Sequence, residues 1–140
     1  MKKQYYALFR ILTSLIFLYA GIGHVLQAEK ILGKFSKSQF YTYIPERSTT
    51  LMLIYISGIV MLIAGTLLAA GYYEKKAAII LLLVLIPITI SAQLDNLKDL
   101  GAFFKNVAIA GSLLFIINYK QNENKNPFII RTNSVKRRLH

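Results

Sequence analysis

The chain has 140 residues, of which 55% are hydrophobic, with a mean hydropathy of +0.47 and a formal net charge of +11. This composition excludes an ordinary soluble domain, and the length leaves room for one compact membrane unit. The sequence contains no cysteine, which excludes a thiol relay, a disulfide shuttle, a thiolate metal site and a thioester intermediate within this chain. Any redox chemistry would therefore need a bound cofactor or a partner.

Four apolar stretches predict an all-α integral membrane protein folded as a four-helix bundle. Each is close to the roughly 20 residues that cross a bilayer as a helix, and they lie near residues 5–26, 51–72, 77–93 and 100–119. We therefore expect a membrane domain over residues 1–119 and a basic cytoplasmic tail over residues 120–140.

The first stretch follows Lys2 and Lys3, like the charged start of a signal peptide. Its apolar run exceeds the usual core of roughly 7–15 residues, so we interpret it as a retained span. Its helical period puts polar and small side chains on one face, which should point into the bundle: Arg10, Thr13, Ser14, Phe17, Ala20, Gly21 and His24. Arg10 is expected to bind lipid phosphate or helix-terminal carbonyls, a lipid-binding or structural role.

Residues 27–50 form a long connection between the first two spans. Their aromatic side chains make this segment amphipathic, so we expect it to lie at the membrane interface as a lid. Small residues recur in the spans on either side of it and in the last span. Such residues let helix backbones approach closely, and we predict helix packing at Gly21, Gly58, Gly65 and Gly111.

The third stretch begins after the short turn at Glu74, Lys75 and Lys76, which makes the second and third helices antiparallel neighbours. Pro87 lies inside this stretch and removes one backbone hydrogen bond, which favours a kink. An ordinary membrane-helix proline is the simpler interpretation of Pro87.

Lys105 and Asn106 stand near the start of the fourth stretch. An ammonium at the centre of a membrane helix costs roughly 2.5–3.5 kcal/mol on insertion scales, so it usually faces protein or water. The predicted topology puts several other polar groups at the same membrane face, and together they could bind a polar headgroup such as a quinone carbonyl, or pass a proton. The candidate ligand-binding residues are His24, Gln93, Asp95, Lys105 and Asn106.

A plainer interpretation of the same residues stays open. Lys105 would then extend its ammonium to the membrane surface and pair with Asp95 or Asp99, and His24 would be an interfacial residue without a ligand. The tyrosines that flank the spans are interpreted as an interfacial aromatic belt: Tyr5, Tyr6, Tyr72, Tyr73 and Tyr119.

No self-contained catalytic motif is recognisable, so the catalytic residues are unknown and the chain is at most a subunit of an enzyme. Only two histidines occur and one is the last residue, which leaves no pair for a transmembrane haem and no metal site.

The distribution of charge indicates a topology. Most of the 17 lysine and arginine residues fall on the side that carries both termini, which predicts cytoplasmic termini in a bacterial inner membrane. Because the positive charge follows the membrane in this way, we expect a lipid bilayer and no nucleic acid as its partner.

The residues assembled so far resemble the DoxX type of small four-span membrane protein, which is related to the DoxD subunit of thiosulfate:quinone oxidoreductase. The resemblance rests on Arg10 and the run from Leu15 to His24, on Ile44-Pro45, on Tyr55 to Gly58 and on Phe104 to Gly111. It implies a redox-associated subunit that interacts with quinone or an oxidoreductase. Met61 stands where many relatives carry a glutamate, so the role of that carboxylate does not carry over.

Three functions follow as hypotheses. The first is the redox-associated membrane subunit, with a quinone as the candidate cofactor. The alternative is a non-enzymatic scaffold or accessory subunit of a larger membrane complex, for which a homodimer is one arrangement. A small transporter is the weakest of the three, because the spans contain no paired inverted break.

Overall fold

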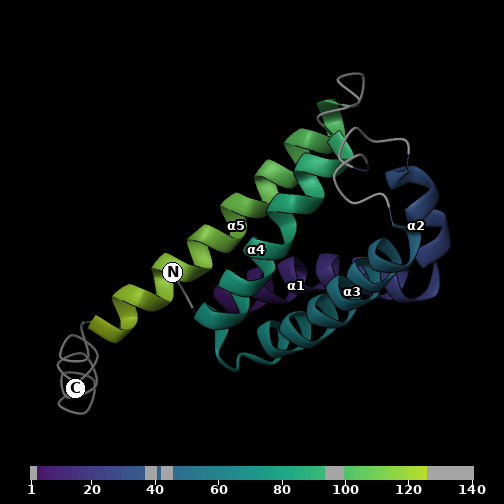
Figure 1. Cartoon of the computed structure of the whole chain (residues 1–140). Coiled ribbons are helices and arrows are strands. Elements are labelled where there is room, and N and C mark those ends of the chain that lie inside the picture. The colour runs from purple at the N-terminus through teal and green to yellow at the C-terminus, as the bar shows by residue number, and fades with distance from the viewer. Residues whose placement is uncertain (1–2, 37–40, 42–45, 94–99, 126–140) are drawn as a thin grey trace, which may run out of the picture.

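The computed structural model describes residues 3–36, 41, 46–93 and 100–125, with residues 91–93 and 120–125 described by their backbone only. Within these ranges every regular element is a helix (Figure 1). The five helices are α1 (Lys3–Leu26), α2 (Ala28–Phe35), α3 (Arg47–Ala70), α4 (Glu74–Gln93) and α5 (Leu100–Lys125). The predicted all-α class is confirmed.

Three of the helices are long and apolar enough to cross a membrane: α1, α3 and residues 100–119 of α5. In the described part of the chain α4 is not among them. The described side chains of α4 cover residues 74–90 only, which is a shorter stretch than in the other three long helices. The prediction of four spans is confirmed for three, and α4 as a fourth span stays a prediction.

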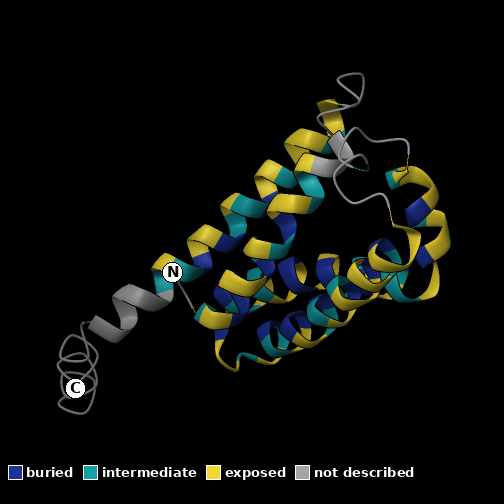
Figure 2. Cartoon of the chain, viewed as in Figure 1, coloured by how far each residue is buried: buried dark blue, intermediate teal, exposed yellow. Residues whose placement is uncertain are grey.

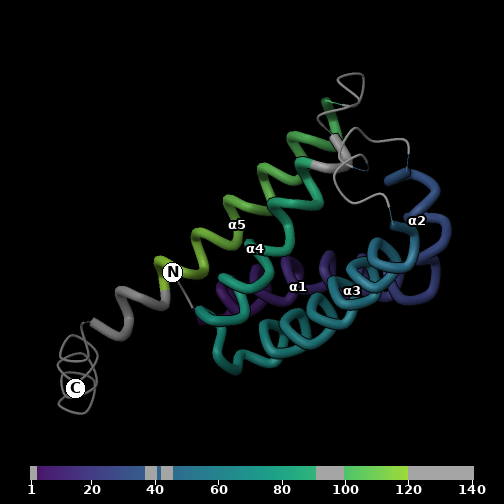
Figure 3. The backbone as a smooth tube through the Cα atoms, viewed as in Figure 1, coloured from purple at the N-terminus to yellow at the C-terminus, as the bar shows by residue number. Residues whose placement is uncertain are grey.

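The long helices are arranged as two pairs. α1 packs along α3, α4 packs along α5, and α3 also contacts α4 across the turn that joins them. Figure 3 shows the two pairs close together near this turn and diverging away from it. We call the two ends of the molecule the Glu74 end, at the α3–α4 turn, and the α2 end.

One core cluster is shared by all four long helices, and it lies toward the Glu74 end. Its buried members come from residues 6–17 of α1, 61–68 of α3, 77–85 of α4 and 109–116 of α5. Leu68, Leu81, Leu113 and Ile116 are completely buried in it. Residues 100–108 of α5, in contrast, include no buried residue (Figure 2).

The predicted faces of the first helix are confirmed. Thr13, Ser14 and Phe17 are buried, whereas Leu12 and Leu15 are more than half exposed. The two hydroxyl groups donate to backbone carbonyls of the preceding turn, as polar groups must where no water is available. The aliphatic face is left for lipid.

The ends of α3 differ from the prediction because of local capping. Glu46 precedes the first turn, and its backbone carbonyl accepts from the Thr50 N–H at 3.0 Å, so the helix starts before its apolar run. Gly71 closes the helix in the left-handed region with φ 84°, and its N–H donates to the carbonyls of Leu67 and Leu68. At the other end of the chain, α5 continues to Lys125, into the segment predicted to be a tail.

The connection between α1 and α3 contains α2. Its buried residues, Ala28 and Leu32, pack against Ile54 of α3, while Glu29, Lys30 and Lys34 are exposed. α2 also contacts α4. The amphipathic segment thus turns its apolar side to the protein.

Candidate functional site

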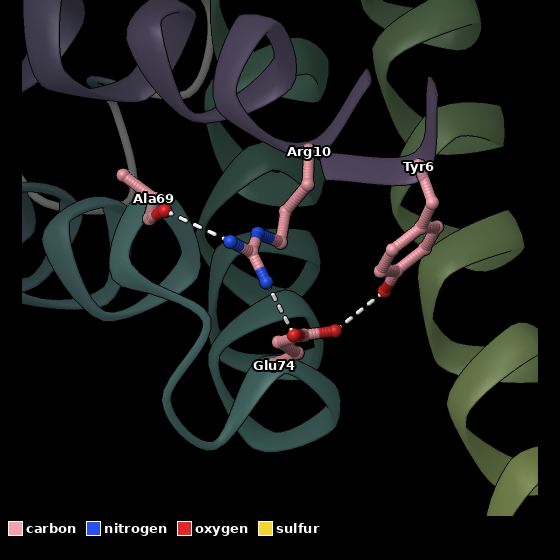
Figure 4. Close-up of polar contacts among 4 residues, drawn as sticks. All are labelled: Tyr6, Arg10, Ala69 and Glu74. Atoms are coloured by element: carbon pink, nitrogen blue, oxygen red, sulfur yellow. Dashed lines mark hydrogen bonds and ion pairs between the residues drawn. The ribbon is translucent and has the colours of Figure 1, made fainter. Parts of the chain in front are cut away.

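A cluster of three polar side chains joins α1 to α4 at the Glu74 end (Figure 4). The Tyr6 hydroxyl donates to Oε2 of Glu74 at 2.5 Å, and Nη1 of Arg10 forms an ion pair with Oε1 of the same carboxylate. Nη2 of Arg10 donates to the backbone carbonyl of Ala69 at 3.2 Å. Glu74 is 7% exposed and the Arg10 side chain 14%. We call these residues the Tyr6–Arg10–Glu74 cluster.

Local sequence explains the position of each member. Tyr6 and Arg10 are four residues apart on α1 and therefore lie on one face of it. Glu74 is the first residue of α4, where the helix dipole favours a carboxylate, and Ala69 offers one of the carbonyls that α3 leaves unpaired at its C-terminus. Gly71 leaves the space, because a Cβ there would overlap the Arg10 guanidinium.

The electrostatics of the cluster are those of a buried ion pair. Hydrogen bonds that involve ionised groups are roughly twice as strong as neutral ones, and the carboxylate of Glu74 accepts from a phenol and a guanidinium at once. Nε of Arg10 is buried and has no hydrogen-bond partner among the described residues. The arrangement therefore depends on the charge of Glu74.

Aromatic contacts extend the cluster to α5. The Tyr6 ring stacks on Tyr119 with 4.3 Å between the ring centroids, and the Phe9 ring meets Phe115 edge-on at 5.4 Å. Through these contacts and the polar ones, a single group of side chains connects all four long helices.

Sequence reasoning missed two members of the cluster. Tyr6 was predicted to belong to the interfacial belt, which is wrong because its side chain is buried and hydrogen-bonded. Tyr5, Tyr72 and Tyr73 are exposed, as expected for such a belt. Glu74 was interpreted only as part of a turn. The available signal was the four-residue spacing that puts a phenol beside Arg10.

His24 lies between α1 and α3. Its Nδ1 is 2.8 Å from Oγ of Ser57, whose hydroxyl hydrogen is donated to the carbonyl of Ile54, also at 2.8 Å. Because a hydroxyl has only one hydrogen, Nδ1 of His24 must be the donor in this contact. In the neutral ring Nε2 is then an acceptor.

Asn106 belongs to the other helix pair. Its Nδ2 donates to Oγ1 of Thr89 on α4 at 3.0 Å, and Thr89 in turn donates to the carbonyl of Leu85 at 2.7 Å. Lys105, the neighbour of Asn106, is exposed on α5.

The three predicted ligand residues whose side chains the structure describes, His24, Lys105 and Asn106, are thus divided between the two pairs. Within the described ranges no hydrogen bond or ion pair connects His24 to Lys105 or Asn106. The side chain of Gln93 and the whole of Asp95 lie outside the described residues. The same ranges contain no group of three or more histidine, cysteine, aspartate and glutamate residues that could hold a metal ion.

Three of the four glycines predicted to pack lie where α1 and α3 approach closely. A Cβ on Gly21 would come within 2.9 Å of the Gly58 carbonyl, and one on Gly58 within 2.8 Å of the Cβ of His24. At Gly65 the nearest atom would be Cδ2 of Leu18, at 3.1 Å. A Cβ on Gly111 would meet no atom of the described residues within 4 Å, so packing at this position stays a prediction.

Helices long enough to span the bilayer, joined by buried polar contacts, define a multi-pass membrane protein. The sequence model of the DoxX family matches residues 6–94, more than half of the chain, and the chain belongs to this family. The matched region contains the Tyr6–Arg10–Glu74 cluster, whereas α5, with Lys105 and Asn106, lies outside it. No curated protein and no solved structure matches the chain.

Met61 has a clear structural role in this family member. It is 2% exposed within the core cluster. The position at which the resemblance implied a glutamate is therefore filled here by an apolar side chain in the shared core.

Proposed function

We propose that this protein is an accessory membrane subunit that binds a membrane-embedded oxidoreductase subunit through the exposed side of α5. The observation that carries the proposal is that residues 100–108, which belong to a candidate span, include no buried residue. We define the α5 docking face as the exposed residues Phe104, Lys105, Val107, Ala108 and Gly111.

The spacing within the α5 docking face suits a helix-to-helix contact. Phe104, Val107, Ala108 and Gly111 recur at intervals of three and four residues and so form one stripe. The small residues Ala108 and Gly111 would let a neighbouring backbone approach closely, as Gly21 and Gly58 do between α1 and α3. No atom of the described residues lies within 4 Å of the position that a Cβ on Gly111 would take.

Lys105 specifies the chemistry of the partner. Its side chain is exposed in an otherwise apolar segment and has no ion-pair partner among the described residues, which do not include Asp95 and Asp99. An unpaired charge is costly in such a segment. A carboxylate on the partner at the same depth would neutralise it. The proposed partner therefore carries an aspartate or glutamate in or near a membrane helix.

The redox part of the proposal rests on the resemblance to the DoxD subunit. This chain has no cysteine to ligate an iron–sulfur centre and only two histidines for a haem, and we assign a flavin or quinone to the partner as well. We further propose that α4 crosses the membrane with the other three long helices, and that both termini are cytoplasmic in a bacterial inner membrane.

A quinone bound by this chain alone has weaker support. A quinone carbonyl needs hydrogen-bond donors, but Nδ1 of His24 already donates to Ser57, and the free Nε2 of the neutral ring accepts. Asn106 retains one amide hydrogen beyond its contact with Thr89. Quinone analysis is therefore one readout of the test.

The test is copurification from native membranes in mild detergent, with protein and small-molecule mass spectrometry, for the wild type and three variants. Lys105→Glu reverses the charge of the docking face, Lys105→Met removes it at similar length, and Lys76→Glu reverses an exposed charge on α4 as the matched control. We expect an oxidoreductase subunit with the wild type and Lys76→Glu, and its loss with both Lys105 variants. Equal recovery with all four proteins, or partners without a redox centre, would contradict the proposal.

A further inference from the structure

We infer that the α4–α5 pair pivots against the α1–α3 pair about the Tyr6–Arg10–Glu74 cluster, and that the pivot is held by the charge of Glu74. This conformational device is independent of the proposed function. It follows from where the described residues of the two pairs share buried contacts and where they do not.

The shared core does not run the full length of the pairs. Its buried members end at Phe17 on α1, Met61 on α3, Leu85 on α4 and Ile109 on α5, so it covers the Glu74 end and the middle of the molecule. Interiors that are packed to high density resist deformation. The α1–α3 and α4–α5 pairs are therefore fixed to one another on the Glu74 side.

Toward the α2 end, each pair is held by its own contacts. The α1–α3 pair has the close approach of Gly21 and Gly58 and the bond between His24 and Ser57. The α4–α5 pair has the bond between Asn106 and Thr89. Each pair can therefore stay intact while the distance between the pairs changes.

α2 is the element against which the α4–α5 pair would move. Its buried residues Ala28 and Leu32 hold it on α3, so it belongs to the α1–α3 body. The contact of α2 with α4 is the one that would open when the pairs separate.

The Tyr6–Arg10–Glu74 cluster is placed to act as the pivot. Glu74 begins α4 and faces the Tyr6 hydroxyl and the Arg10 guanidinium of α1, and Arg10 also binds the last turn of α3. Tyr119 of α5 stacks on Tyr6. Neutralising Glu74 removes the ion pair that Arg10 makes with α4, so the two pairs should be held less rigidly at this end, where the shared core still joins them.

The absence of cysteine makes the test direct, because pairs of introduced cysteines can be spin-labelled without background. Tyr5→Cys with Asn118→Cys reports on the Glu74 end, and Leu26→Cys with Leu100→Cys reports on the α2 end; all four residues are exposed. Distances between the labels are measured by pulsed electron paramagnetic resonance in lipid nanodiscs.

We expect a narrow distance distribution for the first pair and a broader one for the second. In the Glu74→Gln background the first pair should broaden too, and in the Tyr6→Phe background, which keeps both charges, it should broaden less. Lys76→Gln is the control that should change neither pair. Far-UV circular dichroism verifies that each variant is folded. Equal widths for the two pairs in the wild type, or an unchanged first pair with folded Glu74→Gln, would overturn the inference.

Discussion

Glu74→Gln should be among the most destabilising single changes in this chain. The amide keeps the shape of the side chain and removes its charge, which leaves the guanidinium of Arg10 buried without a counter-ion. Breaking a buried ion pair by removing one partner costs about 3–5 kcal/mol, because the remaining charge stays in a medium of low dielectric. We expect a loss in that range in the free energy of unfolding.

The assay is titration with sodium dodecyl sulfate of the protein in mild detergent micelles, followed by far-UV circular dichroism. Arg10→Gln should cost a similar amount, and the double variant should cost less than the sum of the two singles by on the order of 2 kcal/mol, because it leaves neither charge unpaired. Lys76→Gln, on the same helix but exposed, should stay within about 0.5 kcal/mol of the wild type. Strictly additive single changes, or a Glu74→Gln cost below about 1 kcal/mol, would refute a charge-dependent cluster.

Three further outcomes can be measured on the same preparation. Gly58→Ala should destabilise by about 1–3 kcal/mol, because the added methyl overlaps the neighbouring helix, whereas Gly111→Ala, in open space, should be neutral or stabilising; equal effects would contradict the packing described. Gly71→Ala combines φ 84° with overlap of a guanidinium and should cost at least about 1 kcal/mol in detergent titration, and a neutral result would count against the turn. Hydrogen bonds from the hydroxyl groups of Ser48 and Thr49 hold the pKa of Glu46 below its ordinary value. The Glu46 carboxylate therefore adds stability above its unfolded pKa, and this stability is lost as the pH falls through the folded pKa. Ser48→Ala should raise the pKa of Glu46, as followed by NMR of its labelled carboxyl carbon, and an unmoved titration would exclude that bond.

Local patterns were enough to predict the helices and the faces of α1. Apolar runs of spanning length identify α1, α3 and α5, and the helical period separates buried Ser14 and Phe17 from exposed Leu12 and Leu15. The start of α3 was missed because its cap at Glu46 lies in polar sequence, where a hydropathy pattern carries no signal.

The site was harder to predict because it depends on contacts between distant segments. Tyr6 and Glu74 are 68 positions apart, and nothing in the local sequence of either indicates the other. The prediction of the ligand cluster had a related limit, because membrane depth alone does not determine which helices are neighbours. A topology assigns His24 and Lys105 to the same membrane face, but it does not specify that they belong to different helix pairs.

Photo-crosslinking in native membranes tests the proposed docking of a partner most directly. A photoreactive amino acid is placed at Phe104 or Val107, on the α5 docking face, and at Leu12 or Leu15, on the exposed face of α1, and the adducts are identified by mass spectrometry. We predict that both α5 positions capture the same oxidoreductase subunit near an acidic residue, that Lys105→Glu abolishes the adducts, and that the α1 positions give none with that protein. The same adducts from both helices, or only lipid adducts from α5, would contradict the account.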